Sequence, residues 1–302
     1  MLSALHRVEQ NLNQVILGKQ QQIRLALCCL LAEGHLLLED LPGMGKTTLA
    51  HALAKALGLN YKRVQFTNDL LPGDLLGMNI YDTRSAQFYF QPGPIFSQVL
   101  LADEINRASP KTQSALLEAM EERQVSIDGE TRVLQQPFFV IATQNPLFHT
   151  GTSALPESQL DRFLFRISLG FPDKAAELQL LQDEQFGSRL HLLSEPLLPA
   201  QLLALQQQVP KITIQPALLE YILNLVQASR DNKSQLPLSP RAAKAIVRAA
   251  KAMAFLHGRE FVTADDVQHV FPFVAEHRLN PQSVAGDFSI SNTILQSTVC
   301  HL

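Results

Sequence analysis

Short strand-like runs alternate with longer helical stretches through the first half of the chain. The predicted strands span residues 35–38, 62–66, 99–102, 138–143 and 163–168. Most of these runs are almost continuously apolar, which is typical of strands covered on both faces of a parallel sheet. Residues 47–57 and 110–122 have helical character, and Pro110 suits the first turn of the second helix. The pattern therefore predicts a mainly parallel, three-layer α/β/α core.

Further elements are predicted around these strands. Residues 3–33 have the pattern of two helices with a break near Gly18. Residues 78–90 and 124–134 are expected to form two β-hairpins inserted into the α/β core. A stretch punctuated by Pro and Gly, 71–77, leads into the first of these hairpins.

The pattern changes after the sequence Gly170-Phe171-Pro172. From there the chain is rich in Leu, Ala and Gln at helical spacing, with few strand signals. We expect residues 1–172 to form the α/β core and 173–285 a smaller, all-helical domain. Residues 286–302 are polar and poorly patterned, and they are expected to form a C-terminal tail.

Composition narrows the possible classes of protein. The 302 residues are 46% hydrophobic and 18% charged, so the chain can bury a sizeable core. A formal net charge of −3 gives no overall attraction to nucleic acid or to anionic lipid. The three cysteines, Cys28, Cys29 and Cys300, are expected to be thiols, because two of them are adjacent in an apolar stretch. With no signal peptide pattern and no apolar run near the ~18 residues of a spanning helix, we expect a soluble cytoplasmic protein without membrane insertion.

A glycine-rich loop between a predicted strand and a predicted helix has the pattern of a phosphate-binding loop. The candidate nucleotide-binding residues in it are Pro42, Gly43, Met44, Gly45, Lys46, Thr47 and Thr48. Backbone N–H groups of such a loop point at phosphate oxygens, while Lys46 would reach the β- and γ-phosphates and Thr47 would bind Mg²⁺. Asp40 stands where the general pattern has glycine. The simpler alternative is a chance Gly-Lys-Thr loop, which the strand-before, helix-after context disfavours.

Two carboxylates end the predicted strand at 99–102. Asp103 would hold the Mg²⁺ shell, largely through water, and Glu104 would orient and polarise the attacking water. Ligands of parallel sheets bind at the carboxyl ends of the strands, which is where this pair lies. A solvated acidic loop is the alternative for the pair taken alone.

Three further polar residues are candidates for the same chemistry. Asn145 follows the strand at 138–143 and could bind the γ-phosphate or the attacking water. Arg162 precedes the strand at 163–168, and Arg241 begins a helix in the second half. An arginine can stabilise the charge that develops in phosphoryl transfer. Spacing alone leaves open a turn asparagine and two surface arginines in ordinary ion pairs.

Several stretches together resemble a known family. They are 39–47 (EDLPGMGKT), 66–74 (FTNDLLPGD), 90–96 (FQPGPIF), 102–108 (ADEINRA), 113–120 (QSALLEAM), 142–146 (ATQNP), 155–163 (LPESQLDRF) and, in the helical part, 238–242 (LSPRA). The chain resembles an AAA+ ATPase, and within that class the MoxR family. The resemblance is strongest over residues 33–172, and Asp40 is usual for the family.

The resemblance implies a P-loop NTPase fold with a helical lid and a role for each candidate residue. Asn145 would be the sensor-1 residue, and Arg162 the arginine finger acting on ATP of a neighbouring subunit. Arg241 would be the sensor-2 arginine, reporting the γ-phosphate from the lid of the same subunit. The adenine pocket would be lined by Ile16, Leu17 and Gly18.

The resemblance also implies how the protein works. It suggests a homo-oligomeric ring, generally a hexamer, that hydrolyses ATP with Mg²⁺ and matures or activates partners as a chaperone-like factor. Such partners often carry a von Willebrand factor A domain or are enzymes, and the two hairpins would face the central pore. Two alternatives stay open: a nucleotide-gated scaffold with incidental turnover, and the motor subunit of a metal chelatase or nucleic-acid translocase. The net negative charge makes nucleic acid the less favoured partner.

Overall fold

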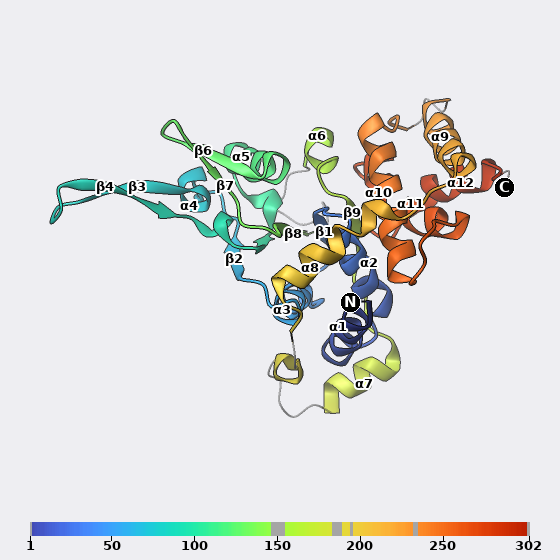
Figure 1. Ribbon diagram of the computed structural model, residues 1–302, viewed down its shortest axis with the longest axis horizontal. Helices are drawn as coiled ribbons and strands as arrows, with labels where there is room; N and C mark the ends of the chain where they lie inside the picture. Colours follow the sequence, from blue (N-terminus) through green and yellow to red (C-terminus); the bar gives the residue numbers. More distant parts are fainter. Residues whose placement is uncertain (1, 146–154, 183–188, 194–195, 232–234, 301–302) are drawn as a thin grey trace.

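The central element is a sheet of five parallel strands, shown in Figure 1. The computed structural model describes residues 2–145, 155–182, 189–193, 196–231 and 235–300. The strands are β1 (Leu36–Glu39), β2 (Tyr61–Gln65), β5 (Val99–Asp103), β8 (Phe139–Gln144) and β9 (Phe165–Ile167). Their order is β2-β5-β8-β1-β9, and each neighbouring pair is parallel. The predicted parallel core is confirmed.

Alternate residues of the buried strands face opposite layers of helices. Leu36 and Leu38 of β1 belong to the apolar cluster that includes α1 (Leu2–Val15), α2 (Gln20–Leu31) and α3 (Lys46–Ala56). Leu37 belongs to a second cluster, which includes α5 (Pro110–Glu122). Both faces of the sheet are therefore covered, which explains why β1, β5 and β8 are apolar at almost every position.

Local sequence signals explain where individual elements begin and end. The Ser109 hydroxyl accepts the backbone N–H of Thr112 at 3.3 Å and caps α5. Arg123 ends this helix in the left-handed conformation, at φ 54°. A short helix that the sequence analysis does not predict, α4 (Pro72–Leu76), lies in the punctuated stretch before the first hairpin. It begins with Pro72, and the Asp74 carboxylate accepts the Leu71 N–H at 2.9 Å.

The two predicted hairpins are present and touch one another. The first consists of β3 (Gly77–Asp82) and β4 (Gln87–Pro92), and it projects from the body of the molecule in Figure 1. The second consists of β6 (Gln124–Ile127) and β7 (Glu130–Val133). The Arg132 guanidinium lies 3.9 Å from the ring centroid of Phe90, and Asn79 donates to the Asp128 carboxylate at 2.7 Å. These contacts join the strands of the first hairpin to the turn and one strand of the second.

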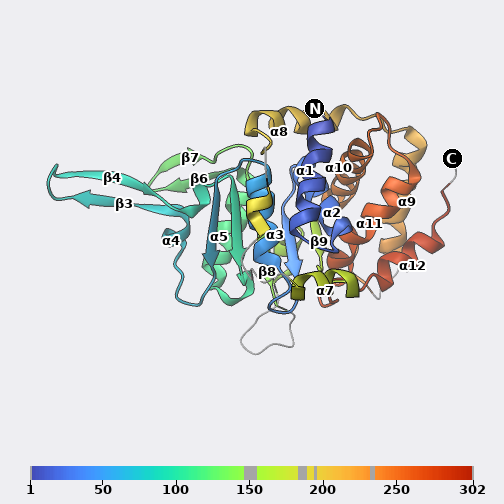
Figure 2. The same cartoon turned by 90° about the horizontal axis from the view of Figure 1, so that it is seen from below.

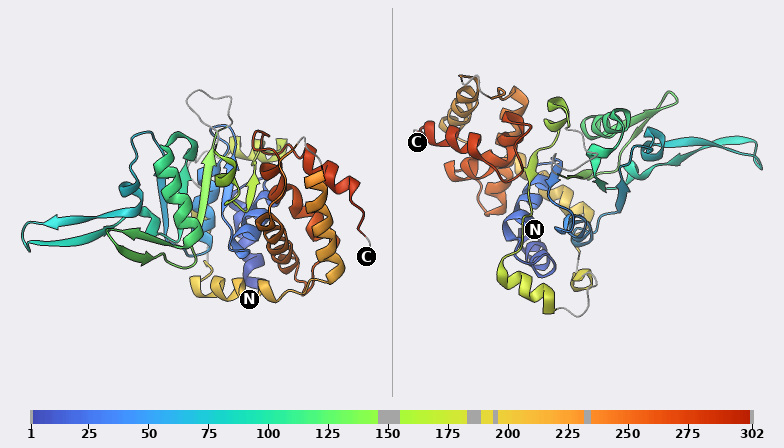
Figure 3. Two further views of the ribbon diagram at one scale, coloured as in Figure 1. Left: turned by 90° about the horizontal axis from the view of Figure 1, so that it is seen from above. Right: turned by 180° about the vertical axis from the view of Figure 1, so that it is seen from behind.

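The second half of the described chain is helical. Its elements are α6 (Glu157–Leu160), α7 (Lys174–Gln182), α8 (Pro199–Gln206), α9 (Pro216–Asp231), α10 (Pro240–Leu256), α11 (Ala264–Leu279) and α12 (Ser289–Ser297), with 3-10 turns at Arg189–Leu192 and Val209–Lys211 and, in the first half, at Pro94–Phe96 and Ile105–Arg107. In Figure 2, α1 and α2 stand between α3 and the helices α10 and α11. Figure 3 shows the hairpins and α9–α12 at opposite ends of the molecule.

Packing continues from the α/β core into these helices. Buried side chains of α2, α9, α10 and α11 belong to one apolar cluster. The segment around α8 also returns to the core, because Leu197 donates its N–H to Ala56 at 2.9 Å and Gln206 donates to the Leu30 carbonyl at 2.7 Å. The expected division at residue 172 therefore does not coincide with a break in the hydrophobic core.

The segment 286–302, expected to be a poorly patterned tail, contains the helix α12. The carboxylate of Glu276, which is buried in α11, accepts the backbone N–H of Ser291 at 2.8 Å and that of Ile290 at 3.4 Å. Ile294 is buried in the main apolar cluster. A helix of nine residues is marginal in isolation. These tertiary contacts therefore explain why α12 forms although its sequence pattern is weak.

His35 lies buried just before β1 as a neutral imidazole. Its Nδ1 accepts the Val140 N–H at 3.0 Å, so the ring proton is on Nε2, which donates to the Met120 carbonyl at 3.2 Å. Burial, opposed by the hydrogen bond to the Met120 carbonyl and helped by the nearby cations Arg123 and Arg248, lowers the pKa of His35 to about 4. The folded protein therefore favours the uncharged ring.

We expect acid to destabilise the fold partly through His35. The folded-state pKa is below the unfolded value of ~6.5, so the neutral ring stabilises the fold above that pH and the stabilisation is lost as pH falls toward 4. The contribution of this group to the free energy of unfolding is up to about 3 kcal/mol. Urea unfolding at pH 7 and pH 5 should show a smaller pH effect in His35→Asn than in wild type. A wild-type pH effect in His35→Asn would contradict this, and His51→Asn, at an exposed position, is the control.

Candidate nucleotide-binding site

The loop after β1 is shaped for close approach of a ligand to its backbone. Gly43 and Gly45 have φ of 85° and 87°, in the left-handed region that glycine occupies without strain. Among the residues that the structure describes, and apart from the chain neighbours, no atom lies within 4 Å of the position that a Cβ would take on either residue. The loop thus has open space above its glycines and leads directly into the amino end of α3, where backbone N–H groups favour anions.

Lys46 is buried at the start of α3 and turns back over the loop. Its ammonium donates to the carbonyls of Asp40 and Leu41 at 2.5 and 3.2 Å and lies 3.4 Å from Oδ1 of Asn145. Burial lowers the pKa of Lys46, while nearby carboxylates, chiefly those of Asp40 and Asp103, oppose that shift. A charged ammonium surrounded only by oxygen acceptors is suited to exchange one of them for a phosphate oxygen.

Asp40, at the position where the general loop pattern has glycine, anchors the loop. Its carboxylate accepts the N–H groups of Leu169 and Gly170 at 2.5 and 3.2 Å and the Ser168 hydroxyl at 2.7 Å. These residues lead from β9 into the helical half of the chain. Asp40 therefore ties the start of the phosphate-binding loop to the crossing between the two halves.

The preceding residue, Glu39, ties the same loop to a more distant part of the helical half. Its Oε1 accepts the Ala285 N–H at 2.9 Å, and its Oε2 lies 3.8 Å from the buried guanidinium of Arg166. Arg166 in turn donates to the Ser283 carbonyl at 2.7 Å. The connection between α11 and α12 is thus held against the carboxyl ends of β1 and β9.

Asp103 lies at the carboxyl end of β5 with both oxygens engaged. Oδ1 accepts the Thr143 hydroxyl at 2.5 Å. Oδ2 accepts two N–H groups of Arg63, at 2.6 and 3.1 Å. A buried carboxylate at this edge is a suitable acceptor for the water shell of Mg²⁺, and Arg63 supplies its positive partner in the described structure.

Glu104 has a strained backbone and three side-chain partners. Its φ and ψ of 55° and 48° are left-handed, a conformation that costs energy for a residue with a side chain. Oε1 accepts the Asn145 amide at 2.9 Å, and Oε2 accepts the Gln65 amide at 2.8 Å. The Arg107 guanidinium lies 3.3 Å from Oε2. The conformation turns Glu104 away from the strand direction and toward Asn145, and so toward the phosphate-binding lysine.

The structure brings together four of the sequence-predicted residues in one hydrogen-bonded cluster. Lys46 and Glu104 both contact Asn145. Thr143 connects Asp103 to Glu104, because its hydroxyl donates to the Asp103 carboxylate and accepts the Glu104 N–H at 2.9 Å. Thr47 and Thr48 follow Lys46 in the first turn of α3, and Pro42 and Met44 lie in the loop itself. This arrangement fits a nucleoside triphosphate with its magnesium, since it combines an open glycine loop, a buried lysine and a pair of carboxylates.

The candidate adenine-binding turn lies close to this loop. Gly18 has φ +68°, and a Cβ there would lie 3.0 Å from the Cβ of Ala176 in α7. The neighbouring Lys19 donates to the Phe171 carbonyl at 2.6 Å. Ile16 is buried and Leu17 is half-buried. The turn therefore packs against the same crossing segment that Asp40 holds, and its role in adenine binding stays a prediction.

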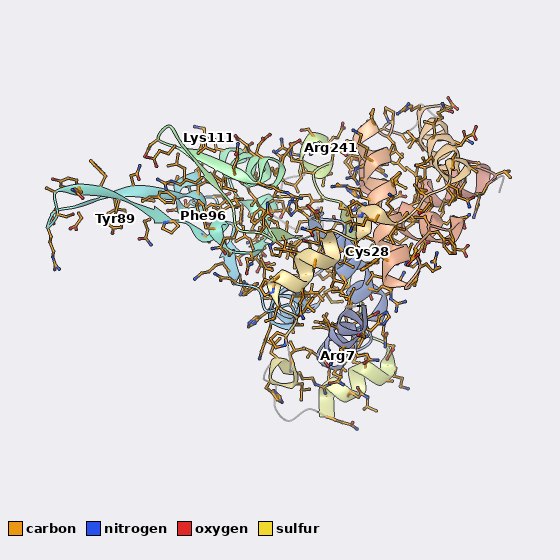
Figure 4. The ribbon with its side chains drawn as sticks, in the orientation of Figure 1. Arg7, Cys28, Tyr89, Phe96, Lys111 and Arg241 are labelled. Carbon is orange, nitrogen blue, oxygen red and sulfur yellow. The ribbon has the colours of Figure 1, made fainter. Side chains whose placement is uncertain are left out.

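Arg162 and Arg241 lie together at the other end of the strands, where β1 and β9 begin. Their guanidinium groups are 3.2 and 2.9 Å from the two carboxylate oxygens of Glu121 in α5. Both arginines line a cleft with His35 and Leu164, the residues just before β1 and β9. Figure 4 shows Arg241 where α10 approaches α6.

This position disagrees with the expectation that Arg241 senses the γ-phosphate of its own subunit. The phosphate-binding loop follows β1, whereas the cleft of Arg241 precedes it. Four residues of β1 separate the two by roughly 13 Å, at ~3.3 Å per residue. The helix α2 lies between the sheet and α10, because it contacts both β9 and α10.

Sequence analysis missed three residues of the site: Arg63, Gln65 and Thr143. Thr143 ends a predicted strand beside Asn145, and a polar residue there was a usable signal. Arg63 and Gln65 alternate along β2 and therefore share one face of it. Because β2 is an edge strand, polar alternation there looks like ordinary solvent exposure, and only the pairing of β2 with β5 shows what these side chains face.

Comparison with known proteins places the chain in a family. Residues 35–165 match the model of the ATPase family associated with various cellular activities (AAA), and residues 227–296 match the AAA lid domain. The chain is 46% identical to YeaC of Bacillus subtilis, with 91% of this chain and 86% of that protein covered. It is 40% identical to Chaperone MoxR1 of Mycobacterium tuberculosis, with 91% and 75% covered.

The chain belongs to the MoxR family of AAA+ ATPases. It is also 36% identical to Protein MoxR of Paracoccus denitrificans, over 90% of this chain and 87% of that one. A crystal structure of a candidate ATPase from Cytophaga hutchinsonii superposes with a TM-score of 0.88 at 35% identity, covering 100% and 96% of the two chains. The predicted MoxR resemblance is confirmed.

We expect Asp40→Gly to harm this MoxR protein although it restores the general loop pattern. The substitution leaves the N–H groups of Leu169 and Gly170 without their charged acceptor, which costs roughly 2–4 kcal/mol of unfolding free energy. Urea unfolding measures that loss, and fluorescence polarisation of a labelled ADP should show weaker binding.

The matched control is Asp69→Gly, which removes a carboxylate at an exposed turn position. Stability and ADP affinity equal to wild type in Asp40→Gly would show that the anchor has no role in positioning the loop.

Proposed function

We propose that this MoxR protein is a Mg²⁺-dependent ATP hydrolase whose turnover drives remodelling or activation of partner proteins. The observation that carries the proposal is the cluster in which Lys46 and Glu104 meet at Asn145, with Asp103 alongside. Nucleotide binding alone would require only the lysine and the loop, without Glu104. A carboxylate beside the phosphate-binding lysine, and held by the same amide, supports chemistry as well as binding.

The residues of the chain divide the work as follows. The loop amides and Lys46 bind the phosphates, and the hydroxyl of Thr47 with the carboxylate of Asp103 would hold the magnesium, which neutralises developing charge on the phosphates. Glu104 polarises the attacking water and accepts its proton. Asn145 orients Glu104 and bonds to phosphate or water without adding charge. Glu104 must first give up one of its present partners, because both of its oxygens are engaged.

Glu104→Gln should separate binding from hydrolysis. The amide keeps the shape of the side chain but cannot accept a proton, so steady-state ATPase activity falls by about a hundredfold or more while labelled ATP still binds. Glu118→Gln, which changes an exposed glutamate of α5, is the control and should keep wild-type turnover. Equal turnover in wild type and Glu104→Gln, with and without partner proteins, would instead favour a nucleotide-gated scaffold in which hydrolysis is incidental.

The two arginines at the other edge of the sheet support a site shared between subunits. Arg162 and Arg241 lie on the side away from the phosphate-binding loop of their own chain, and one carboxylate, Glu121, holds both. In a head-to-tail ring this edge would meet the loop of the next subunit. We therefore propose that Arg241, like Arg162, acts on ATP bound to the neighbouring subunit and not on ATP of its own subunit. A hexamer is the ring that the MoxR resemblance suggests.

Mixing two inactive variants tests both assignments. Lys46→Ala removes phosphate binding but keeps both arginines, whereas Arg241→Ala keeps the phosphate site. If Arg241 acts in trans, the mixture regains ATPase activity, because Lys46→Ala subunits supply Arg241 to intact loops of their neighbours. Arg162→Ala mixed with Lys46→Ala should behave in the same way. Mixtures no more active than the separate variants would refute sharing, and Arg189→Ala serves as the control arginine variant.

The partner class follows from the relatives and from one exposed surface. The name Chaperone MoxR1 of the mycobacterial relative suggests client proteins for this chain as well, with a von Willebrand factor A domain protein or an enzyme as the expected kind. The projecting β3–β4 hairpin exposes Tyr81, Phe88 and Tyr89, the last labelled in Figure 4, and such aromatic side chains suit contact with protein. Within the part of the chain that the structure describes, no helix combines the length and apolarity needed to cross a bilayer. A cytoplasmic location stays a prediction.

A further inference from the structure

An arginine from the edge strand lies directly on the carboxylate expected to hold magnesium. Arg63 places Nη2 at 2.6 Å and Nε at 3.1 Å from Oδ2 of Asp103. The Asp103 side chain is only 10% exposed, whereas that of Arg63 is 50% exposed. The carboxylate is therefore built into the sheet, and its cationic partner reaches it from the solvent side.

Charge explains why such a partner is present. Asp103 is a buried carboxylate next to Glu104 in the chain, and an unpaired charge in this position would be unfavourable. Arg63 neutralises Asp103 on one oxygen, and the Thr143 hydroxyl satisfies the other. A hydrated Mg²⁺ approaching Oδ2 would meet the guanidinium at the same oxygen, and the two cations would repel one another.

We propose that Arg63 is a positioning residue that acts as the built-in counter-ion of Asp103 and competes with magnesium for it. This inference rests on the proposed binding of Mg²⁺ and ATP at the site. Arg63 stabilises the nucleotide-free site and leaves Asp103 when metal-bound nucleotide arrives. Its position on an edge strand, half exposed, gives the guanidinium room to move without disturbing the sheet.

The same arginine also contacts the residue that holds the second carboxylate. Its Nη2 lies 3.4 Å from the amide oxygen of Gln65, which orients the amide nitrogen toward Glu104, where the bond is 2.8 Å long. Departure of Arg63 from Asp103 would remove this constraint on Gln65. Arrival of the metal would thereby loosen one of the bonds that hold Glu104 before it acts on water.

The experiment measures the Mg²⁺ dependence of nucleotide binding, which needs no turnover. Labelled ADP binds to wild type, Arg63→Gln and Arg63→Lys in EDTA and across a Mg²⁺ titration. Arg63→Gln removes the competing charge, so we expect half-maximal binding at roughly 1.5- to fivefold lower Mg²⁺, the range for a partly exposed ion pair. In EDTA the same variant should bind ADP more weakly than wild type, because Asp103 then repels the phosphates. Arg63→Lys keeps the charge and should stay near wild type.

Lys62→Gln is the matched control, because it removes a neighbouring charge on β2 whose side chain points to the other face of the strand. If Arg63→Gln does not fold, as judged by urea unfolding, Arg63→Met replaces it. A Mg²⁺ midpoint equal to or higher than that of wild type would overturn the inference. Weaker binding by the same factor with and without Mg²⁺ would also overturn it, since Arg63 would then be a phosphate ligand. Absence of Mg²⁺-dependent ADP binding in wild type would instead refute the proposed function.

Discussion

The site depends on the parallel pairing of β5, β8 and β1. Parallel strands end at one edge, and the register places the ends of β5 and β8 beside the loop that follows β1. Residues far apart in the chain, Lys46, Asp103 and Asn145, thereby come within hydrogen-bonding reach of one cluster. A shift of one residue in β5 would turn Asp103 to the other face of the sheet, because side chains alternate along a strand. The apolar faces of these strands hold the register, since both layers of helices bury them.

The opposite edge of the sheet carries complementary chemistry. Arg162 and Arg241 come from the two halves of the chain, and the carboxylate of Glu121 joins them. The phosphate-binding loop lies where the strands end and the arginines lie where they begin, so under the proposed function one molecule presents two different halves of a shared site. This polarity is the physical basis for expecting activity to depend on assembly. Asp40 also contacts the crossing into the helical half, and Glu39 contacts the connection after α11, so both residues that precede the phosphate-binding loop are bonded to distant parts of the chain.

Side chains of the edge strand β2 balance the charge of the site. Each carboxylate of the pair at the end of β5 has a polar partner on β2, Arg63 for Asp103 and Gln65 for Glu104. These partners hold two close carboxylates in place. The proposed binding of nucleotide and magnesium would therefore exchange hydrogen-bond partners within the site.

Much of the site was predictable from the sequence, because its signals are local. A loop of glycines between an apolar run and a helix, and two acids after an apolar run, are determined by backbone conformation and burial over a few residues. The hairpins and the order of strands and helices follow from the same kind of pattern. The tertiary structure alone decided the features that join distant residues: the anchoring of Asp40 by residues 168–170, the contact of Arg63 with Asp103, the ordering of α12 by Glu276, and the position of Arg241 away from its own phosphate loop. Each of these depends on which elements become neighbours, and periodicity along one chain carries no information about partners that folding brings together.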